Sequence, residues 1–247
     1  MTQHAQGTYS GFDFAAGQYS TQAWEAVQST LRDIETMGFV QELAAGTLEE
    51  KTFTHYIVQD ELYLAGYTKA MSLLAAKAPN QHDVQFWLQA AGDAVAEEQV
   101  LHRQLLGTER LGKYVADLCD ADGNPQPSPT TLGYVSYLIA ECATASYEVG
   151  VAAVLPCFWV YAHMGKVLTR QVGEKMSTHP YREWIEAYDA EEFDQAVRQA
   201  ITVYEACATS ATEATRQAMR AAFIRATVYE WHFWGAAHIR QDWSLPR

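Results

Sequence analysis

Apolar residues recur along the chain at steps of three and four, the spacing that places them on one side of an α-helix. From Ser20 this pattern continues through Trp24 and Val27, and it returns after each interruption along most of the chain. Gly46 and Thr47 form one such interruption, because they combine a helix stop with the N-cap of a following helix. The pattern predicts helices at about residues 20–45, 47–77, 82–106, 130–145, 148–172, 181–188, 193–208 and 212–238.

A β-sheet is not expected, because no segment shows sustained alternation of apolar and polar residues with a period of two. About eight helices with short connections predict one compact all-α bundle. Residues 113–129 are rich in turn-forming residues and are expected to form a loop between helices. The polar residues 1–16 are expected to form a loosely held arm ahead of a single all-helical domain over residues 17–247.

The net charge of −13, from 17 Lys and Arg against 30 Asp and Glu, argues against nucleic acid and anionic membranes as partners. The N-terminus lacks a basic region followed by an apolar run, so it does not resemble a secretory signal. The longest uncharged run, residues 149–165, is shorter than a membrane span. The four cysteines show no CxxC spacing, which favours free thiols in a reducing compartment. We expect a soluble cytoplasmic protein.

The segment YEVGVAAVLPCFWVY, residues 147–161, is apolar enough to be buried, yet it contains Pro156 and Cys157. A proline inside a helix removes a backbone donor and crowds the preceding turn, so we expect a kinked helix that forms the floor of a ligand pocket. Backbone amides exposed by such a break would favour the thiolate of Cys157, which makes this residue a candidate nucleophile. The alternative is an inert buried thiol, the common state of a free cysteine.

Asp60, Tyr63 and Tyr67 lie three and seven residues apart, so they share one face of the predicted helix. An aspartate beside two tyrosines can anchor a polar ligand held between aromatic rings. The alternative is a solvent-facing aspartate with structural tyrosines, which is the more common arrangement.

Glu230 lies in a strongly aromatic helix, VYEWHFWGAAH. Apolar surroundings raise the pKa of a carboxyl group, which suits a general acid. The alternative is a glutamate on the solvent side of that helix. Candidates for pocket walls or for ordinary core residues are Tyr134, Tyr137, Tyr181 and Tyr188, and Tyr161 shares a helix face with Cys157 one turn earlier.

The sequence gives little support for a metal centre. Di-iron bundles use two Glu-x-x-His units, whereas this chain offers Glu98 and His102 four residues apart and no second copy. A local side-chain pair or a helix-packing contact is the simpler interpretation. The sequence contains no HExxH motif, no glycine-rich phosphate loop and no GxSxG elbow. We therefore expect no metal and no nucleotide cofactor.

An ordered set of segments resembles the TenA family (thiaminase II, aminopyrimidine aminohydrolase). The segments are AGTLEEKTFTHYIVQDELYL, GYVSYL, LPCFWVYAHMGK, YREWIEAY and ATVYEWHFW, and they extend from about Trp24 to Trp234. No single motif is specific, but the ordered set is. The resemblance implies the haem-oxygenase-like helical bundle, usually assembled as a homotetramer, in agreement with the all-α prediction.

The resemblance also implies roles for individual residues. Cys157 matches the family's nucleophile, and Glu230 matches its acid/base. Asp60 matches the aspartate that binds the aminopyrimidine, and Tyr63 is expected close to the cysteine, where it tunes the thiol. The remaining expected substrate-binding residues are tyrosines: Tyr67, Tyr134, Tyr161 and Tyr188.

The implied activity is cysteine-dependent hydrolysis in thiamin salvage, without a metal or organic cofactor. The substrate would be 4-amino-5-aminomethyl-2-methylpyrimidine, converted to the 5-hydroxymethyl compound with release of ammonia, or thiamin itself, cleaved to the pyrimidine and the thiazole. Two alternatives stay open on the same bundle. One is a haem-oxygenase-like or di-iron oxidase, and the other is a non-catalytic pyrimidine-binding protein.

Overall fold

The computed structural model describes residues 10–243, apart from the side chains of residues 97–99. The predicted all-α bundle is confirmed: the described residues form no β-strand, only an isolated bridge between Cys119 and Pro125. The main helices are α1 (Gln18–Ala26), α2 (Gln28–Thr36), α3 (Gly38–Ala45), α4 (Glu50–Lys77), α5 (Gln81–Glu97), α8 (Pro129–Thr144), α9 (Tyr147–Val172), α10 (Arg182–Tyr188), α11 (Glu191–Ser210) and α12 (Glu213–His238). Shorter elements are η1 (Phe12–Phe14), the π-helix η2 (Glu98–His102), α6 (Arg103–Leu106), α7 (Glu109–Gly112), η3 (Val115–Leu118) and η4 (Gly173–Thr178).

The first predicted helix is in fact three helices. Met37 adopts an extended backbone conformation that ends α2 and begins α3, and Val27 separates α1 from α2. These breaks allow successive short helices to direct Ile34 and Phe39 into the core, where both are fully buried. Periodicity alone does not reveal such breaks, because the apolar spacing continues across them.

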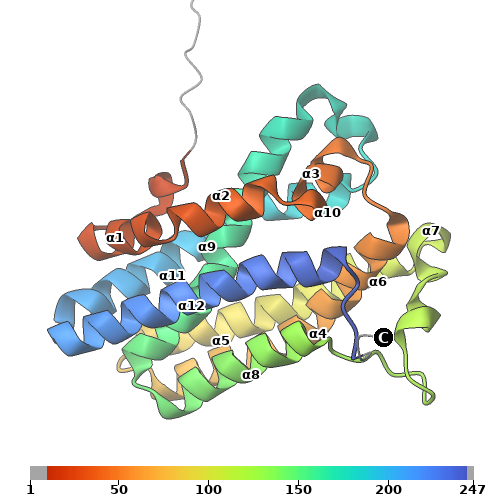
Figure 1. Ribbon diagram of the computed structural model, residues 1–247. Helices are drawn as coiled ribbons and strands as arrows, with labels where there is room; N and C mark the ends of the chain where they lie inside the picture. Colours follow the sequence, from red (N-terminus) through yellow and green to blue (C-terminus); the bar gives the residue numbers. More distant parts are fainter. Residues whose placement is uncertain (1–9, 244–247) are drawn as a thin grey trace, which may run out of the picture.

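Helix α9 is the central element of the bundle. It packs against α12, α11, α8 and α10, and Figure 1 shows it passing behind α12 and rising toward the top of the view. The segment Tyr147–Thr178 is long and apolar enough to cross a membrane, but 83% of its most apolar window is buried inside the protein. Helix α9 is therefore the core helix of a soluble helical protein.

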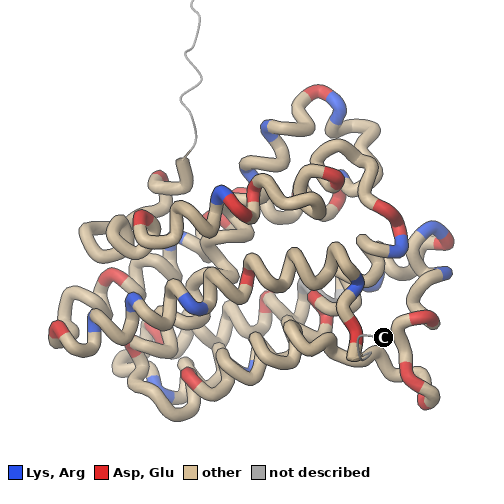
Figure 2. The backbone as a smooth tube through the Cα atoms, in the orientation of Figure 1, with Lys and Arg blue, Asp and Glu red and all other residues tan. Residues whose placement is uncertain are grey.

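Helices α4 and α8 lie side by side, and a buried glutamine fixes their register. The side-chain oxygen of Gln59 on α4 accepts hydrogen bonds from the backbone N–H of Ser128 (2.8 Å) and the hydroxyl of Thr131 (2.7 Å). Ser128 is also the N-cap of α8, so one side chain ties the start of α8 to the middle of α4. The charged residues, by contrast, are spread over the outer helices and loops, as Figure 2 shows.

The N-terminal segment packs more closely than predicted. Phe14 is 2% exposed, and the stacked indoles of Trp24 and Trp159 donate hydrogen bonds to the carbonyls of Ser10 and Gly11. The expectation of a loosely held arm is therefore wrong for residues 10–16, because an apolar anchor and two indole N–H groups hold this segment on the bundle. Residues 1–9 lie outside the described part of the chain.

The segment after α12 runs back over the starts of two other helices. Arg240 donates to the hydroxyl of Thr52 in the first turn of α4 (3.1 Å). The side-chain oxygen of Gln241 accepts from the backbone N–H of Thr130 in α8 (3.0 Å), and Trp243 donates to a carbonyl of the loop before α8. We call residues 240–243 the C-terminal strap.

Candidate active site

A cavity of about 400 Å³ opens between α4, α5, α9 and the α10–α11 segment. Asp60 and Tyr67 line it from α4, Cys157 and Tyr161 from α9, and Tyr188 from α10. Residues predicted as catalytic and substrate-binding from three distant parts of the sequence therefore share one cavity. Its size suits a small organic molecule.

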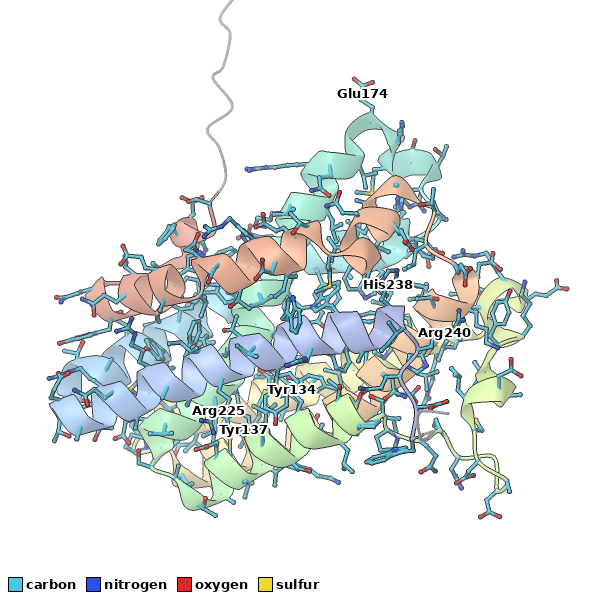
Figure 3. The ribbon with its side chains drawn as sticks, viewed as in Figure 1. Tyr134, Tyr137, Glu174, Arg225, His238 and Arg240 are labelled. Carbon is cyan, nitrogen blue, oxygen red and sulfur yellow. The ribbon has the colours of Figure 1, made fainter. Side chains whose placement is uncertain are left out.

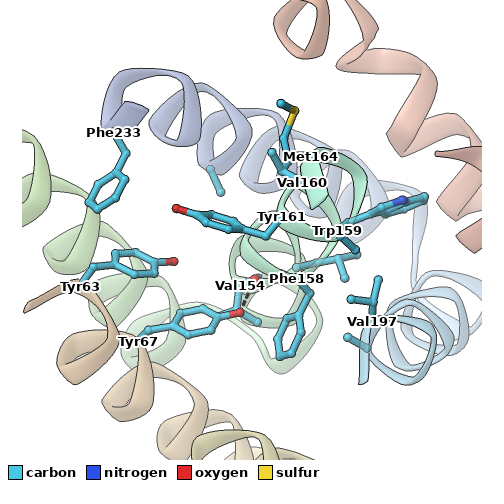
Figure 4. Close-up of a cluster of buried hydrophobic side chains, with 14 of the residues drawn as sticks. Tyr63, Tyr67, Val154, Phe158, Trp159, Val160, Tyr161, Met164, Val197 and Phe233 are labelled. Atoms are coloured by element: carbon cyan, nitrogen blue, oxygen red, sulfur yellow. Dashed lines mark hydrogen bonds between the residues drawn. The ribbon is translucent and has the colours of Figure 1, made fainter. Parts of the chain in front are cut away.

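Three other predicted site residues do not line the cavity: Tyr63, Tyr134 and Glu230. The ring of Tyr63 stacks on that of Tyr67 with centroids 5.4 Å apart and lies 5.0 Å from that of Tyr134. Figure 4 shows the hydroxyl ends of Tyr63, Tyr67 and Tyr161 directed toward the same space. These tyrosines form an aromatic layer between the cavity and helices α8 and α12.

Tyr63 and Tyr67 both lower the pKa of the Cys157 thiol, but their hydroxyl protons are engaged differently. The hydroxyl of Tyr67 donates to the carbonyl of Val154 on α9 (2.7 Å), so its proton is already committed. The hydroxyl of Tyr63 interacts with the thiol and lowers its pKa, although it is not aligned as a full hydrogen-bond donor. Of the two, Tyr63 has the proton available for a thiolate.

The thiol of Cys157 is neutral at physiological pH. The residue keeps some accessible surface because it lines the cavity, while protein atoms surround its sulfur. Burial raises the pKa of the Cys157 thiol well above its ordinary value, and Glu230 and Asp60 raise it further, while Tyr63 and Tyr67 lower it. A nucleophilic role therefore requires that the thiol lose its proton during the reaction.

The expected thiolate at a helix break is therefore wrong. Helix α9 is continuous from Tyr147 to Val172, with Pro156 inside it. Cys157 consequently lies in the middle of a helix and not at a helix N-terminus, so no set of free amides stabilises a negative charge there. Desolvation is the dominant influence on the thiol.

Glu230 is buried, with an exposed fraction of 1%, which excludes the solvent-side alternative. One of its carboxylate oxygens accepts a hydrogen bond of 2.6 Å from the hydroxyl of Tyr134. Figure 3 labels Tyr134 between α12 and α8. Burial raises the pKa of Glu230 to about 8, with a smaller contribution from Asp60 and an opposing one from the Tyr134 hydrogen bond. At pH 7 this carboxyl group holds a proton that it can donate.

Asp60 is also buried, at 2% exposure, so the alternative of a solvent-facing aspartate is wrong. Its carboxylate is the polar group that α4 presents to the cavity among mostly apolar and aromatic neighbours. A buried carboxylate surrounded by aromatic rings is suited to bind a flat ligand that offers N–H donors.

The family assignment rests on most of the chain. Residues 34–241 match the family model described as TENA/THI-4/PQQC family. The chain belongs to the TENA/THI-4/PQQC family. The resemblance to the TenA family stated from the sequence segments is thereby confirmed.

Relatives of this TENA/THI-4/PQQC chain include proteins named for thiamin chemistry. It is 31% identical to the aminopyrimidine aminohydrolase of Bacillus subtilis (strain 168), with 83% of this chain and 84% of that protein aligned. It is 28% identical to the aminopyrimidine aminohydrolase of Helicobacter pylori, over 90% of this chain and 99% of that protein. It is 35% identical to the thiamine biosynthesis multifunctional protein ThiED of Corynebacterium glutamicum, but there the alignment covers 93% of this chain and only 28% of the relative.

Solved structures give the same fold. A TenA homologue from P. horikoshii OT3 superposes with a TM-score of 0.76 and 25% identity, covering 90% of this chain and 99% of that one. Haem oxygenase-1 from Synechocystis sp. PCC6803 superposes with a TM-score of 0.59 at 18% identity, covering 89% of this chain and 91% of that one. The haem-oxygenase-like fold predicted for this TENA/THI-4/PQQC chain is therefore confirmed.

Sequence reasoning missed Tyr56, a buried residue one turn before Asp60 on α4. Its hydroxyl donates to the hydroxyl of Tyr161 across a distance of 3.1 Å. Because Tyr161 accepts this bond, its own proton is left to donate elsewhere, and Tyr161 lines the cavity. The spacing of four residues from Asp60 was a usable signal, since it places Tyr56 on the same helix face.

Sequence reasoning interpreted His102 as part of a local side-chain pair or a helix-packing contact, without naming Asp60 as its partner. The side chain of Glu98 lies outside the described part of the chain, so the suggested local pair is not described. What the structure gives His102 is a contact with Asp60: Nε2 of His102 lies 3.1 Å from Oδ2 of Asp60, and both side chains are almost fully buried.

The outer wall of the cavity is the turn between α10 and α11, and α9 holds it in place. A Cβ atom at Gly165 would collide with the backbone carbonyl of Tyr188, so only glycine permits this approach. The next residue, Lys166, forms ion pairs with Asp189 (3.1 Å) and Asp194 (2.7 Å) on either side of the turn. Tight backbone packing and a paired lysine thus fix the position of Tyr188.

The residues of the described chain do not form a metal centre. No group of three or more His, Cys, Asp and Glu residues is placed to hold a metal ion between residues 10 and 243, side chains 97–99 aside. His102 contacts the carboxylate of Asp60. This donor set does not fit a di-iron oxidase of the kind considered from the sequence.

Proposed function

We propose that this protein is a cysteine-dependent aminopyrimidine aminohydrolase of thiamin salvage. Its substrate would be 4-amino-5-aminomethyl-2-methylpyrimidine, and its products the 5-hydroxymethyl compound and ammonia. Thiamin would be a second substrate, cleaved to the same pyrimidine and the thiazole. The names of the B. subtilis and H. pylori relatives support the reaction class.

One observation carries the proposal: a neutral thiol lines the cavity, and a protonated carboxyl group lies close enough to this thiol to raise its pKa. Burial raises the pKa of both Cys157 and Glu230. The first provides a nucleophile once its proton is removed, and the second provides a general acid at neutral pH. A pyrimidine ring is a poor electrophile until one of its nitrogens is protonated, so the two groups act best together.

Substrate binding would use the carboxylate of Asp60 and the aromatic walls. The carboxylate accepts a hydrogen bond from the exocyclic amine of the pyrimidine, and the rings of Tyr161 and Tyr188, 4.9 Å apart, pack around the heterocycle. These contacts orient the ring so that one face meets the Cys157 sulfur. The mostly apolar lining of the cavity surrounds the rest of the ring.

In the first half of the reaction, the sulfur of Cys157 forms a bond to a ring carbon while Glu230 gives its proton to a ring nitrogen. The thiol proton passes to the side-chain amine. The electron pair of the resulting enamine then breaks the carbon–nitrogen bond, so that ammonia leaves and an exocyclic alkene remains. Tyr63 supports this half by donating to the developing thiolate.

In the second half, water adds to the exocyclic carbon and gives its proton to the departing thiolate. The sulfur–carbon bond breaks, the ring nitrogen returns its proton to Glu230, and aromaticity is restored. With thiamin, the thiazole leaves as a neutral molecule and takes no proton, so the thiol proton is released to water and the overall reaction yields one proton. Covalent catalysis divides one difficult displacement into two easier steps.

Ammonia release from the aminomethyl pyrimidine tests this proposal, with thiamin cleavage measured alongside. Cys157→Ala should lower turnover on the order of 10³-fold or more. Cys207→Ala is the matched control, because Cys207 is a buried free cysteine on α11 outside the cavity lining. Undiminished turnover by the Cys157 variant would remove this residue from the mechanism.

The setting of the reaction is also a proposal. We infer a cytoplasmic homotetramer that binds small aminopyrimidines. The acidic net charge argues against nucleic acid and anionic membranes as partners, and the buried position of the apolar helix α9 argues against a membrane span. Light scattering on the purified protein tests the oligomeric state directly.

A further inference from the structure

His102 contacts Asp60, a residue of the cavity wall, without lining the cavity itself. Oδ2 of Asp60 lies 3.1 Å from Nε2 of His102, and the two side chains are 3% and 0% exposed. The imidazole is imperfectly aligned with the oxygen, a geometry that often improves in enzymes when substrate binds. The other carboxylate oxygen is left for a ligand.

A local distortion of the helix accompanies this contact. After α5 the chain continues as the π-helix η2, which ends at His102, and then as α6. A π-helical turn holds an extra residue and rotates the side chains that follow, and such turns are frequent at functional sites. His102 is fully buried while Val100, two residues earlier, is 56% exposed. The distorted turn thus accompanies the burial of an imidazole against Asp60.

Other roles for His102 agree less well with its position. The proposed reaction leaves it no role as a general base, because Cys157 and Glu230 supply and take back the protons that move. It is not part of a metal cluster within the described residues. A buried carboxylate, on the other hand, binds a ligand well only if its own orientation is fixed by hydrogen bonds from the surrounding protein.

We propose that His102 is a positioning residue for Asp60 and thereby a determinant of affinity for 4-aminopyrimidines. This inference rests on the proposed function. The Nε2–H group of His102 holds Oδ2, so that the remaining carboxylate oxygen points at the amino edge of the ring. The ligand class is a flat heterocycle in which an exocyclic amine adjoins a ring nitrogen. When that nitrogen is protonated, the same edge carries a second N–H donor, and the remaining carboxylate oxygen has two lone pairs with which to accept from the edge.

Calorimetric titration with 4-amino-5-hydroxymethyl-2-methylpyrimidine tests this role. His102→Leu removes the donor, and His102→Asn keeps an amide that is too short to reach Oδ2. Both should weaken binding about tenfold, the effect of leaving one buried acceptor without its donor. His102→Gln carries an amide at the distance of Nε2 and should bind within about threefold of the wild type.

The decisive comparison is a double-mutant cycle with Asp60→Asn. If His102 acts through Asp60, His102→Asn should change the affinity less than about twofold in the Asp60→Asn background. An equal tenfold loss in both backgrounds indicates a general structural role and overturns the proposal, as does wild-type affinity in the Leu and Asn variants. Wild-type protein that binds no aminopyrimidine refutes the proposed function together with this inference. Wild-type protein that binds while the cycle is additive refutes this inference alone.

Discussion

Replacing Glu230 by Gln should make the protein more stable while removing most of its activity. The pKa of Glu230 is about 8 in the folded protein against 4.5 for an unperturbed glutamate, so folding at neutral pH requires proton uptake. The resulting loss of stability is absent below about pH 4.5, grows as the pH rises and levels off above about pH 8. It amounts to about 1, 3 and 4 kcal/mol at about pH 5.5, 7 and 8.

Glutamine avoids this loss because it does not titrate, and its carbonyl can still accept the hydrogen bond of Tyr134. Its amide group lacks an assigned partner, which subtracts about 1 kcal/mol at every pH. The stability difference between variant and wild type should therefore rise from about zero at about pH 5.5 to about 3 kcal/mol at about pH 8. Ammonia release should fall about 10²- to 10⁴-fold, because the general acid is lost.

Urea denaturation at a series of pH values measures this difference, and referring the variant to the wild type cancels the titration of all other groups. Glu174→Gln is the control, since Glu174 is exposed at the outer end of the molecule (Figure 3) and should give a flat difference. A flat difference for Glu230→Gln as well would refute the assignment of Glu230 as a buried, protonated carboxyl group.

Two further substitutions test the walls of the cavity. Gly165→Ala forces Cβ against the Tyr188 carbonyl. The free energy of unfolding in urea should fall by about 1–3 kcal/mol, and KM should rise because Tyr188 and the cavity wall that it forms are displaced. The control is Gly92→Ala in α5, where a Cβ atom meets no neighbour; this variant should be more stable than the wild type by up to about 1 kcal/mol. Equal changes in stability at the two glycines would show that the cavity wall at Gly165 is not tightly packed. Tyr56→Phe removes the donor to Tyr161 and should cost about 1 kcal/mol and weaken product binding. Unchanged affinity in calorimetry would exclude Tyr56 as the residue that orients Tyr161.

Much of the fold follows from periodicity. The predicted helices over residues 47–77 and 148–172 agree with α4 and α9 to within a few residues, because each has a clear stop or cap at its ends. The boundaries at Val27 and Met37 could not be predicted, since tertiary packing selects them and no Gly or Pro marks the residue itself. The same holds for the packing of Phe14, whose burial depends on partners far away in the sequence.

The arrangement of site residues could be predicted from the sequence where the residues lie on the same helix. The spacing of Asp60, Tyr63 and Tyr67 gives a shared face in any α-helix, and the structure agrees. The state of the Cys157 thiol was not predictable, because desolvation by the whole bundle determines its pKa. Neither was the contact of His102, since the π-helical turn before it departs from the period on which helix-face reasoning depends.

The C-terminal strap makes the two ends of the protein unequal for engineering. Residues 240–243 fasten the first turns of α4 and α8, the helices that bear Asp60 and Tyr134. An affinity tag, a fusion partner or an immobilisation linker joined at or before residue 240 would disturb these hydrogen bonds. The disturbance would be transmitted to the site along α4 and α8. The same additions joined ahead of residue 10 meet a segment anchored through Phe14 at a distance from these ties, which makes the N-terminal side the better place for attachment.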